Sequence, residues 1–268
     1  MLILLILLLI LAFFYLFALH GRTGRMRLSS FRKFAFAHRG LHDENAPENS
    51  MAAFRAALAQ GYGAELDVHL MADGNLAVIH DSSLLRTAGC DVKIEDLTTE
   101  DLPNYRLSNG ETIPLFSEVL ALIGGKVPLI IELKSTTENF SQLTEAAVAA
   151  MQGYLGCWCM ESFDPRCIRH LKKHYPKITR GQLSENFFRS PESKLPWYFK
   201  LAMTLLLSNF LTSPDFVAYR FSDRENLSLR ICRKLWRLPV ITWTLKTPEE
   251  FDAAMEAEMI SIFEGFLP

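Results

Sequence analysis

Short apolar runs alternate with amphipathic segments along most of this chain, from about residue 33 to the C-terminus. Apolar runs of four to eight residues between turn-forming residues are typical of buried strands, whereas apolar residues spaced three and four apart indicate helices. The pattern predicts strands at 33–38, 64–67, 128–133, 156–162, 177–181, 215–219, 238–243 and 259–263. It predicts helices at 50–60, 115–123, 140–151, 165–174, 195–210, 224–235 and 248–257.

Strands that alternate with helices form parallel sheets, because each parallel connection must cross back over the sheet. Eight such strands favour a closed (β/α)8 TIM barrel over an open sheet. Barrels of roughly 250 residues are usually single domains. We therefore expect residues 33–268 to form one α/β barrel.

The first nineteen residues differ from the rest because they contain no charge and no strong helix breaker. At about 1.5 Å per residue, a helix over residues 1–19 is just long enough for a hydrocarbon core of ~30 Å. A cleavable signal peptide usually carries Lys or Arg before its apolar run, and none stands there. The segment therefore predicts a retained transmembrane anchor, followed by a basic linker at 20–32.

Basic residues without accompanying acids follow this segment, namely Arg22, Arg25, Arg27, Arg32 and Lys33. Such an excess marks the cytoplasmic side of a span. The expected localisation is thus the cell membrane, with one span and a cytoplasmic barrel. Five cysteines without framework spacing fit reduced thiols in that compartment. The net charge of −2 argues against nucleic acid as a partner.

Asp73-Gly74 lies between two apolar runs, which is a strong signal for a β-hairpin. With these as the two turn residues, His80 would lie directly opposite Asp67. Opposed residues have Cβ atoms roughly 4.5–5.5 Å apart. The hairpin is therefore expected to fold His80 back to the end of the second strand.

Ionisable residues end three of the predicted strands. They are His38 and Arg39, Glu65 and Asp67, and Glu132 and Lys134. Active sites of TIM barrels lie at the carboxyl ends of the strands, and residues two apart on a strand share a face. We therefore expect these side chains to share one rim with His80.

Three carboxylates on one rim repel one another, and the sequence suggests no protein counter-ion that matches them. Glu65, Asp67 and Glu132 offer the oxygen ligands that hard cations prefer, whereas zinc favours nitrogen and sulfur. The expected cofactor is one divalent cation, Ca²⁺ or Mg²⁺.

These and further motifs together resemble the glycerophosphodiester phosphodiesterase family, from about residue 34 onward. The matching motifs are His38-Arg39-Gly40, Pro47-Glu48-Asn49-Ser50 with Ala53-Phe54, Glu65-x-Asp67, Asp73-Gly74, His80-Asp81, Glu132-x-Lys134, Ser162-Phe163 and Trp243-Thr244. No single motif is specific, but their combination and order are.

The resemblance implies a TIM barrel that hydrolyses glycerophosphodiesters to sn-glycerol 3-phosphate and an alcohol, in phospholipid and glycerol metabolism. It implies that Glu65, Asp67 and Glu132 hold one divalent metal. It also implies roles for eight other residues: His38 and His80 as catalytic pair, Arg39 and Lys134 at the phosphate, Phe163 and Trp243 at the substrate, and Glu48 and Asn49 in or just behind the metal shell. Two positions depart from the family. Glu264 stands where an aspartate is usual, and His69, which faces away from Asp67 or into the hairpin, replaces a threonine.

Phosphodiester hydrolysis needs one group to remove a proton from the nucleophile and another to protonate the leaving alkoxide. His38 and His80 fit these roles, and the sequence does not assign base and acid between them. It also leaves open whether water or a substrate hydroxyl attacks first. A cation with Arg39 and Lys134 would stabilise the added negative charge.

Several alternatives remain at this point. The substrate is either a soluble glycerophosphodiester or a lysolipid, which would make the protein a lysophospholipase D. The apolar segment 195–210 is either a buried barrel helix or a lipid contact. A phosphatidylinositol-type phospholipase C also uses two histidines. A non-catalytic barrel that binds lipid headgroups would be expected to lack one of the site residues.

Overall fold

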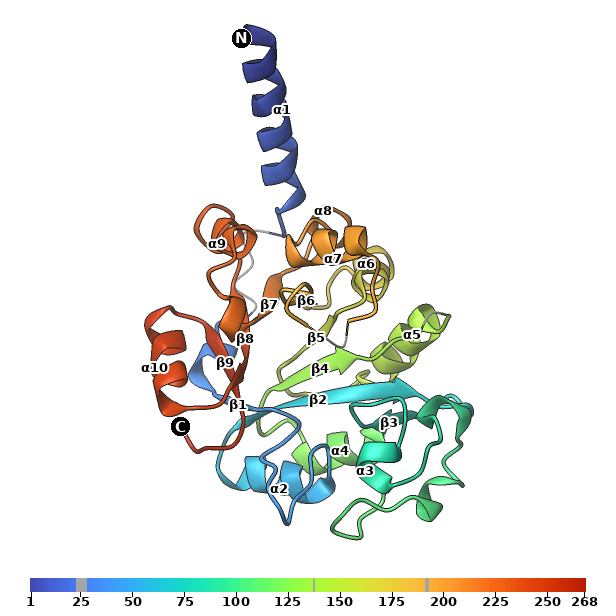
Figure 1. Cartoon of the computed structure of the whole chain (residues 1–268). Coiled ribbons are helices and arrows are strands. Elements are labelled where there is room, and N and C mark those ends of the chain that lie inside the picture. The colour runs from blue at the N-terminus through green and yellow to red at the C-terminus, as the bar shows by residue number, and fades with distance from the viewer. Residues whose placement is uncertain (23–27, 137, 191–192) are drawn as a thin grey trace.

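Eight parallel strands form a closed barrel in this computed structural model, which describes residues 1–22, 28–136, 138–190 and 193–268 (Figure 1). The strands are β1 (Phe36–Ala37), β2 (Gly63–Leu70), β4 (Leu129–Leu133), β5 (Trp158–Ser162), β6 (Arg180–Ser184), β7 (Phe216–Arg220), β8 (Val240–Leu245) and β9 (Ile260–Phe263). They follow one another around the barrel, and β1 closes it by pairing with both β2 and β9. The predicted TIM barrel is confirmed.

Helices surround this barrel and connect its strands (Figure 1). They are α2 (Met51–Ala59), α3 (Leu85–Ala88), α4 (Phe116–Ile123), α5 (Phe140–Ala150), α6 (Pro165–His174), α7 (Trp197–Thr204), α8 (Asn209–Thr212), α9 (Leu227–Lys234) and α10 (Pro248–Glu256). Short 3-10 helices are η1 (Phe31–Lys33), η2 (Ile94–Asp96), η3 (Leu102–Asn104) and η4 (Phe221–Asp223). Side chains of Ser50, Asp164 and Thr247 accept backbone N–H bonds at the starts of α2, α6 and α10. Such caps are local signals, so these starts were predictable from sequence.

The barrel interior is packed with apolar side chains, and the ionisable residues of the predicted site lie above them at the carboxyl ends of the strands. Phe36, Ile130, Leu183, Phe216 and Ile241 fill it from five strands and are buried. Burying one such side chain contributes roughly 1.5–3 kcal/mol. This packed apolar layer therefore supports the ionisable groups at the strand ends.

The first strand is shorter than predicted, because Lys33 ends the helix η1 and the strand covers only Phe36–Ala37. Phe31 is buried in the barrel core and stacks on Phe36, with ring centroids 5.4 Å apart. Leu28 is buried in the same cluster. The end of the expected linker is thus part of the folded barrel. Arg25 and Arg27 lie outside the described residues.

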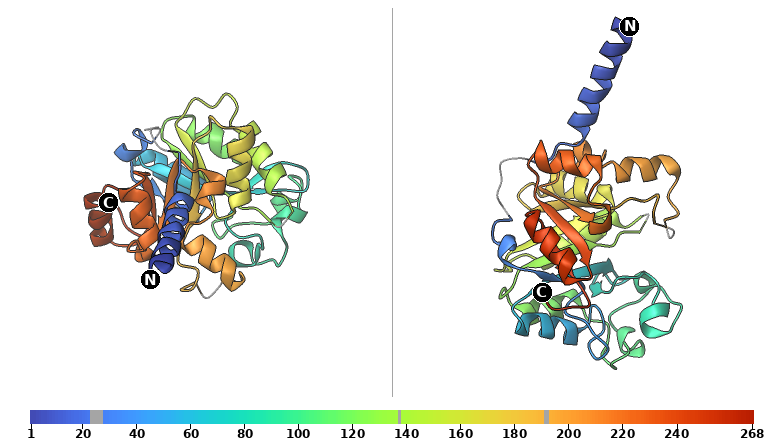
Figure 2. Two further views of the ribbon diagram at one scale, coloured as in Figure 1. Left: turned by 90° about the horizontal axis from the view of Figure 1, so that it is seen from above. Right: turned by 60° about the vertical axis from the view of Figure 1, so that its left-hand side comes forward.

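The N-terminal helix α1 (Leu2–Ala18) extends away from the barrel (Figures 1 and 2). Its C-terminal end contacts the barrel, where Trp236 Nε1 donates to the Leu16 carbonyl at 3.0 Å and Leu19 is buried. Within the described ranges, no helix has both the length and the apolar character needed to cross a membrane. The predicted transmembrane span is not confirmed.

The apolar segment 195–210 is not the single helix expected from its pattern. It contains α7 and the start of α8, and the chain turns between them at Leu206, which has a φ of +56°. It is also not an ordinary buried barrel helix, because Trp197 and Tyr198 are 70% and 54% exposed.

A hairpin extends β2 beyond the barrel, where β3 (Leu76–Val78) pairs antiparallel with it. Val68 lies opposite Val78, and the Ile79 N–H donates to the Asp67 carbonyl at 3.1 Å. Ile79 rather than His80 therefore lies opposite Asp67, so the predicted register is wrong by one residue.

The turn explains this shift. The Met71 N–H donates to the Asn75 carbonyl at 2.9 Å, which leaves three residues in the loop instead of two. Gly74 has a φ of +84°, the left-handed conformation that commonly ends a three-residue loop. The Asp73 carboxylate accepts from the backbone of Asn75 and Thr99 and so holds this longer turn.

Candidate active site

A polar cleft lies at the carboxyl end of the barrel and collects the ionisable residues of the strand ends. Its lining includes His38, Arg39, Glu65, His80, Glu132, Lys134, Glu161, Phe163 and Trp243. These residues come from five strands and the hairpin. The structure therefore brings together both histidines and the basic and aromatic residues singled out in the sequence.

Three buried carboxylates form the centre of the site. Glu65 and Asp67 lie two apart on β2, and Asp67 lies beside Glu132 on β4 in the sheet register. Glu65, Asp67 and Glu132 are only 2%, 1% and 7% exposed, respectively. One oxygen of each lies within 4.8 Å of those of the other two. This spacing allows one cation to contact all three.

Two basic residues contact these acids, contrary to the expectation that no counter-ion would match them. Lys134 Nζ lies 2.8 Å from Glu132 Oε1 and 3.2 Å from Asp67 Oδ1. Arg39 Nε lies 3.4 Å from Asp67 Oδ2. The backbone N–H of Arg39 donates to Glu65 Oε2 at 3.0 Å. Both positive charges thus lie inside the acid cluster.

A fourth acid, Glu161, lies beside the three central acids. Glu161 is buried on β5, beside Glu132 in the register. Burial and the charge of Glu132 raise its pKa well above the usual range. Glu161 was not among the site residues predicted from the sequence. The rule that identified Glu132, an acid at the end of a buried strand, also applies to Glu161.

The pKa values of the three central acids diverge. Burial and repulsion by Asp67 raise the pKa of Glu65 well above its usual value and that of Glu132 to about 7. Burial opposes ionisation of Asp67 as well, but Lys134, His80 and Arg39 hold its pKa well below the usual range. A cation would therefore relieve repulsion at Glu65 and Glu132 above all.

The carboxylate set fits a hard divalent cation. Asp67 Oδ1 is buried and has no hydrogen-bond partner among the described residues, although Lys134 lies nearby. Glu161 Oε2 is likewise buried and unpartnered within the described part of the chain. Oxygen-only donors of this kind suit Ca²⁺ or Mg²⁺. Glu65, Asp67 and Glu132 are the residues that would hold it.

His38 follows β1 and is held by Glu264, which follows β9. His38 Nδ1 lies 2.6 Å from Glu264 Oε2. A carboxylate at Nδ1 favours the proton on that nitrogen and leaves Nε2 as the acceptor. Burial lowers the pKa of His38, whereas the hydrogen bond that its Nδ1 donates to Glu264 opposes that shift. The acid that departs from the family pattern thus orients a catalytic candidate.

The backbone after His38 turns sharply into the next loop. Arg39 and Gly40 have φ values of +55° and +79°. A Cβ on Gly40 would come within 2.9 Å of Ala53, so glycine is required there on both grounds. This turn places the Arg39 N–H on Glu65.

His80 has a similar carboxylate partner on the other side of the cleft. Its Nδ1 lies 2.6 Å from Asp81 Oδ1, and Arg86 Nε donates to Asp81 Oδ2 at 2.6 Å. Burial, together with the charge of Lys134, lowers the pKa of His80 to about 4. Both histidines therefore present a neutral imidazole whose Nδ1 is engaged.

His69 points to the same side of β2 as Asp67 and braces the hairpin. Its Nε2 lies 3.0 Å from the His80 carbonyl, and its Nδ1 lies 2.8 Å from Glu95 Oε1. Ser82 Oγ donates to the other oxygen of Glu95 at 2.6 Å. His69 lines a cavity together with His80, so of the two orientations considered it does not face away from the site.

Glu48 and Asn49 lie behind the central acids. Glu48 Oε1 accepts from Arg39 Nη1 at 2.9 Å and from Arg86 Nη2 at 2.6 Å, so it links the two arginines. Asn49 Nδ2 donates to Asp67 Oδ2 at 2.8 Å. Glu48 thus contacts bases, and Asn49 alone touches one of the three acids.

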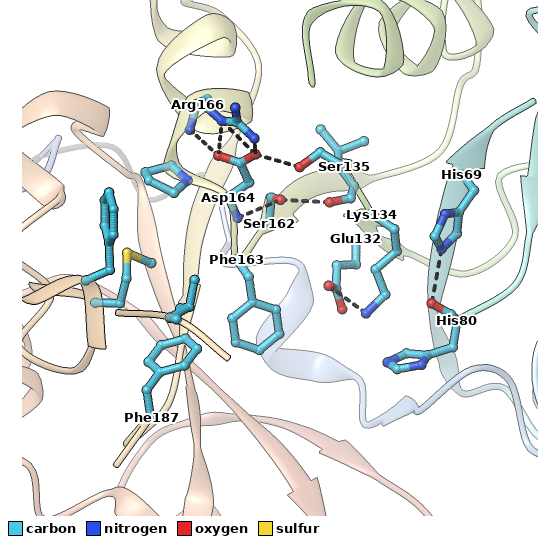
Figure 3. A pocket seen from close by; sticks show the side chains of 15 residues that line it. His69, His80, Glu132, Lys134, Ser135, Ser162, Phe163, Asp164, Arg166 and Phe187 are labelled. Atoms are coloured by element: carbon cyan, nitrogen blue, oxygen red, sulfur yellow. Dashed lines mark hydrogen bonds and ion pairs between the residues drawn. The ribbon is translucent and has the colours of Figure 1, made fainter. Parts of the chain in front are cut away.

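Phe163 and Trp243 close the cleft on its apolar side. Their rings meet edge to face with centroids 5.6 Å apart, and Phe163 makes a similar contact with Phe187 at 6.0 Å. Figure 3 shows Phe163 between Phe187 on one side and Glu132 with Lys134 on the other. The aromatic residues expected at the substrate therefore separate charged and apolar regions.

The sequence is similar to a known enzyme family. The family model described as "Glycerophosphoryl diester phosphodiesterase family" matches residues 38–264. A glycerophosphodiester phosphodiesterase of Caldanaerobacter subterraneus subsp. tengcongensis is 33% identical over 183 residues, which cover 64% of this chain and 73% of the relative. One from Bacillus altitudinis is 42% identical over 120 residues, covering 41% of this chain and 49% of the relative.

Solved structures share the fold. A phosphodiesterase of Oleispira antarctica, in complex with the product sn-glycerol-3-phosphate, matches with a TM-score of 0.72 at 22% identity, over 88% of this chain and 94% of its own. A putative glycerophosphoryl diester phosphodiesterase of Silicibacter pomeroyi gives a TM-score of 0.71 at 21% identity, over 94% and 93%.

Proposed function

Since the chain belongs to the glycerophosphoryl diester phosphodiesterase family and is a phosphoric diester hydrolase, we propose that it hydrolyses glycerophosphodiesters with the help of one divalent cation. The products are sn-glycerol 3-phosphate and an alcohol. The observation that carries this proposal is the cluster of Glu65, Asp67 and Glu132, whose oxygens lie within 4.8 Å of one another in the cleft that His38 and His80 also line.

Positive charge at the phosphorus centre is the first requirement. The diester carries one negative charge, and its pentacoordinate transition state carries more. Bound between the three acids, Ca²⁺ or Mg²⁺ would stabilise that added charge. Arg39 and Lys134 line the same cleft and offer N–H donors to the phosphate oxygens.

Proton transfer is the second requirement, and the two histidines can provide it. Each Nδ1 contacts a carboxylate, Glu264 or Asp81, so Nε2 is the nitrogen of each ring that can accept or donate a proton at the substrate. One imidazole takes a proton from the attacking hydroxyl, and the other, protonated, gives its proton to the leaving alkoxide. The carboxylates hold both rings and stabilise the imidazolium form.

We also propose that the protein attaches to a membrane through α1. Most of the large apolar side chains of this helix are about half exposed or more, and no charge interrupts them. Apolar surfaces this extensive are rare on soluble monomers and favour contact with lipid. A cytoplasmic barrel stays a prediction from the basic residues after α1. External protease on intact spheroplasts would leave the barrel uncut, whereas digestion from outside would overturn that orientation.

A release assay tests the activity. The full chain, purified in detergent, is given glycerophosphocholine and glycerophosphoethanolamine with and without chelator, and glycerol phosphate is measured. We expect release that EDTA abolishes and that Ca²⁺ or Mg²⁺ restores. Full turnover in chelator would contradict the cation, and no release from any glycerophosphodiester with either cation would contradict the activity.

A further inference from the structure

A second, larger cavity opens beside the polar cleft (Figure 3). His80, Glu132 and Lys134 lie at its polar end and also line the cleft, so the two spaces are adjacent. On one side the larger cavity is lined by polar residues, Ser135, Ser162, Asp164 and Arg166. The opposite walls are apolar and include Phe163, Phe187, Leu195, Phe199 and Met203. In Figure 3, the Phe187 ring lies on the far side of Phe163 from Glu132 and Lys134.

The size and walls of this cavity do not suit the polar parts of a glycerophosphodiester. Its volume is about 690 Å³, against about 40 Å³ for the polar cleft. Pockets of roughly 300–1,000 Å³ bury most of a drug-sized ligand. The Asp164 carboxylate on the polar side already accepts hydrogen bonds from Ser135 at 2.6 Å and from Arg166 at 2.7 Å. Hydroxyl and ammonium groups placed against the phenyl rings and Met203 would lose hydrogen bonds to water without replacement. The cavity therefore fits a sizeable apolar group that is attached close to the phosphate.

The mouth of the cavity is itself apolar. Phe199, on α7, is 52% exposed, and its neighbours Trp197 and Tyr198 are exposed as well. Lys200 is the one charged residue in the sequence of α7. Helix α8, which follows α7 in the chain, packs against the barrel end of α1 (Figure 1). Exposed aromatic residues of this kind favour the membrane–water interface.

We infer that the apolar cavity binds the acyl chain of a monoacyl glycerophosphodiester, so that lysophospholipids are substrates of this site. The inference rests on the proposed function and assigns its substrate class. Glycerol is the alcohol that can carry such a chain, because it keeps a hydroxyl free after forming the phosphodiester. A headgroup such as choline has no corresponding position.

The reaction is the hydrolysis already proposed. The oxygen of water forms a new bond to phosphorus, and the bond between phosphorus and the headgroup oxygen breaks. One proton of water reaches the leaving alkoxide through the histidine pair. The products are an acylglycerol phosphate, whose chain stays in the cavity until release, and the free alcohol.

A chain-length series measures the contribution of the cavity. Glycerophosphocholine and its 1-hexanoyl, 1-octanoyl and 1-decanoyl derivatives are compared below their micelle concentrations, with choline release as the readout. Each buried methylene can raise kcat/KM by up to about fourfold, the equivalent of about 0.8 kcal/mol. We expect the octanoyl compound to exceed glycerophosphocholine by at least about tenfold.

Other outcomes distinguish failure of the acyl-chain site from failure of the proposed hydrolase function. If choline is released from glycerophosphocholine and kcat/KM does not rise with chain length, the acyl cavity is refuted and the proposed function stands. If none of the four compounds releases choline, the proposed function itself fails. If kcat/KM rises for glycerophospho-octanol and not for the acylated compounds, the cavity binds the leaving alcohol and the inference is wrong.

Adjacent residues of α7 provide a matched pair of variants. Phe199 lines the cavity, whereas Tyr198 does not, and the two are 52% and 54% exposed. Phe199→Asp should lower the ratio of octanoyl to unacylated kcat/KM at least about fivefold, and Tyr198→Asp should keep it. Met203→Trp, which narrows the cavity, should shift the optimum to shorter chains. The same ratio in all three variants as in the original chain would overturn the inference.

Discussion

Substitution of Glu264 by glutamine tests the link between the last strand and His38. Glutamine keeps the length of the side chain and removes the charge that lies 2.6 Å from His38 Nδ1. A hydrogen bond to a charged group contributes about 1.5–3 kcal/mol. Each 1.36 kcal/mol is tenfold in rate, so kcat should fall by about tenfold to 150-fold if the bond is formed mainly in the transition state.

The pH profile should change in a defined direction. Burial, the larger effect, lowers the pKa of His38, and the hydrogen bond from His38 to Glu264 raises it. Without the carboxylate, the pKa of His38 falls further, and the imidazole stays neutral to lower pH. We therefore expect Glu264→Gln to shift an ionisation in the kcat/KM profile to lower pH. A change in folding alone would lower the thermal midpoint without moving this ionisation.

Lys246→Gln is the matched control. Lys246 lies on the surface, and its Nζ is 2.8 Å from an oxygen of the same Glu264 carboxylate. Its side chain is 68% exposed, and such pairs contribute about 0–1 kcal/mol. Choline release from glycerophosphocholine at saturating cation measures kcat for both variants. The reasoning is refuted if Glu264→Gln keeps more than half of kcat, or if Lys246→Gln loses as much.

Four further predictions follow from the site. Glu132→Gln should lower activity by orders of magnitude. It should also abolish the stabilisation that Ca²⁺ or Mg²⁺ gives the original chain, which is about 2.7 kcal/mol at a hundredfold excess over Kd and is measured as a rise in thermal midpoint; an unchanged rise would exclude Glu132 as a ligand. His38→Ala and His80→Ala should each remove nearly all turnover of an alkyl diester, and a nitrophenyl leaving group should rescue only the variant that lacks the general acid; equal rescue contradicts separate roles. His69→Ala, which frees the His80 carbonyl, should lower kcat about tenfold with little change in KM, and an unaltered kcat would show that the brace is dispensable. Deletion of residues 1–19 should move the protein from floating liposomes to the soluble fraction in a flotation assay, and continued flotation would contradict attachment through α1.

The positions of the three central acids were predictable because the rule that finds them is local. Glu65 and Asp67 end one buried strand, and Glu132 ends another, so a parallel barrel places them on one rim. Their counter-ions were not predictable in the same way. Lys134 shares a strand face with Glu132, but its contact with Asp67 depends on the pairing of β2 with β4.

The hairpin shows where local rules become ambiguous. Asp73-Gly74 correctly marks the turn, yet the same dipeptide fits a loop of two or of three residues. The choice of three shifts every pair by one position and places Ile79 opposite Asp67. The contact between Asp73 and Thr99, a residue of a later loop, helps to hold the longer turn. Register therefore depends on a contact that the hairpin sequence does not contain.

The sequence by itself determined the barrel, its strand and helix order, and the acids at two strand ends, because periodicity and strand-end position are properties of short segments. Only the tertiary structure decided that Glu264 holds His38, since closure of β9 onto β1 joins residues 226 positions apart. The apolar cavity likewise arises where Phe163 and Phe199, from separate connections, face one space. Such contacts depend on how distant segments pack, and packing between distant segments leaves no local pattern in the chain.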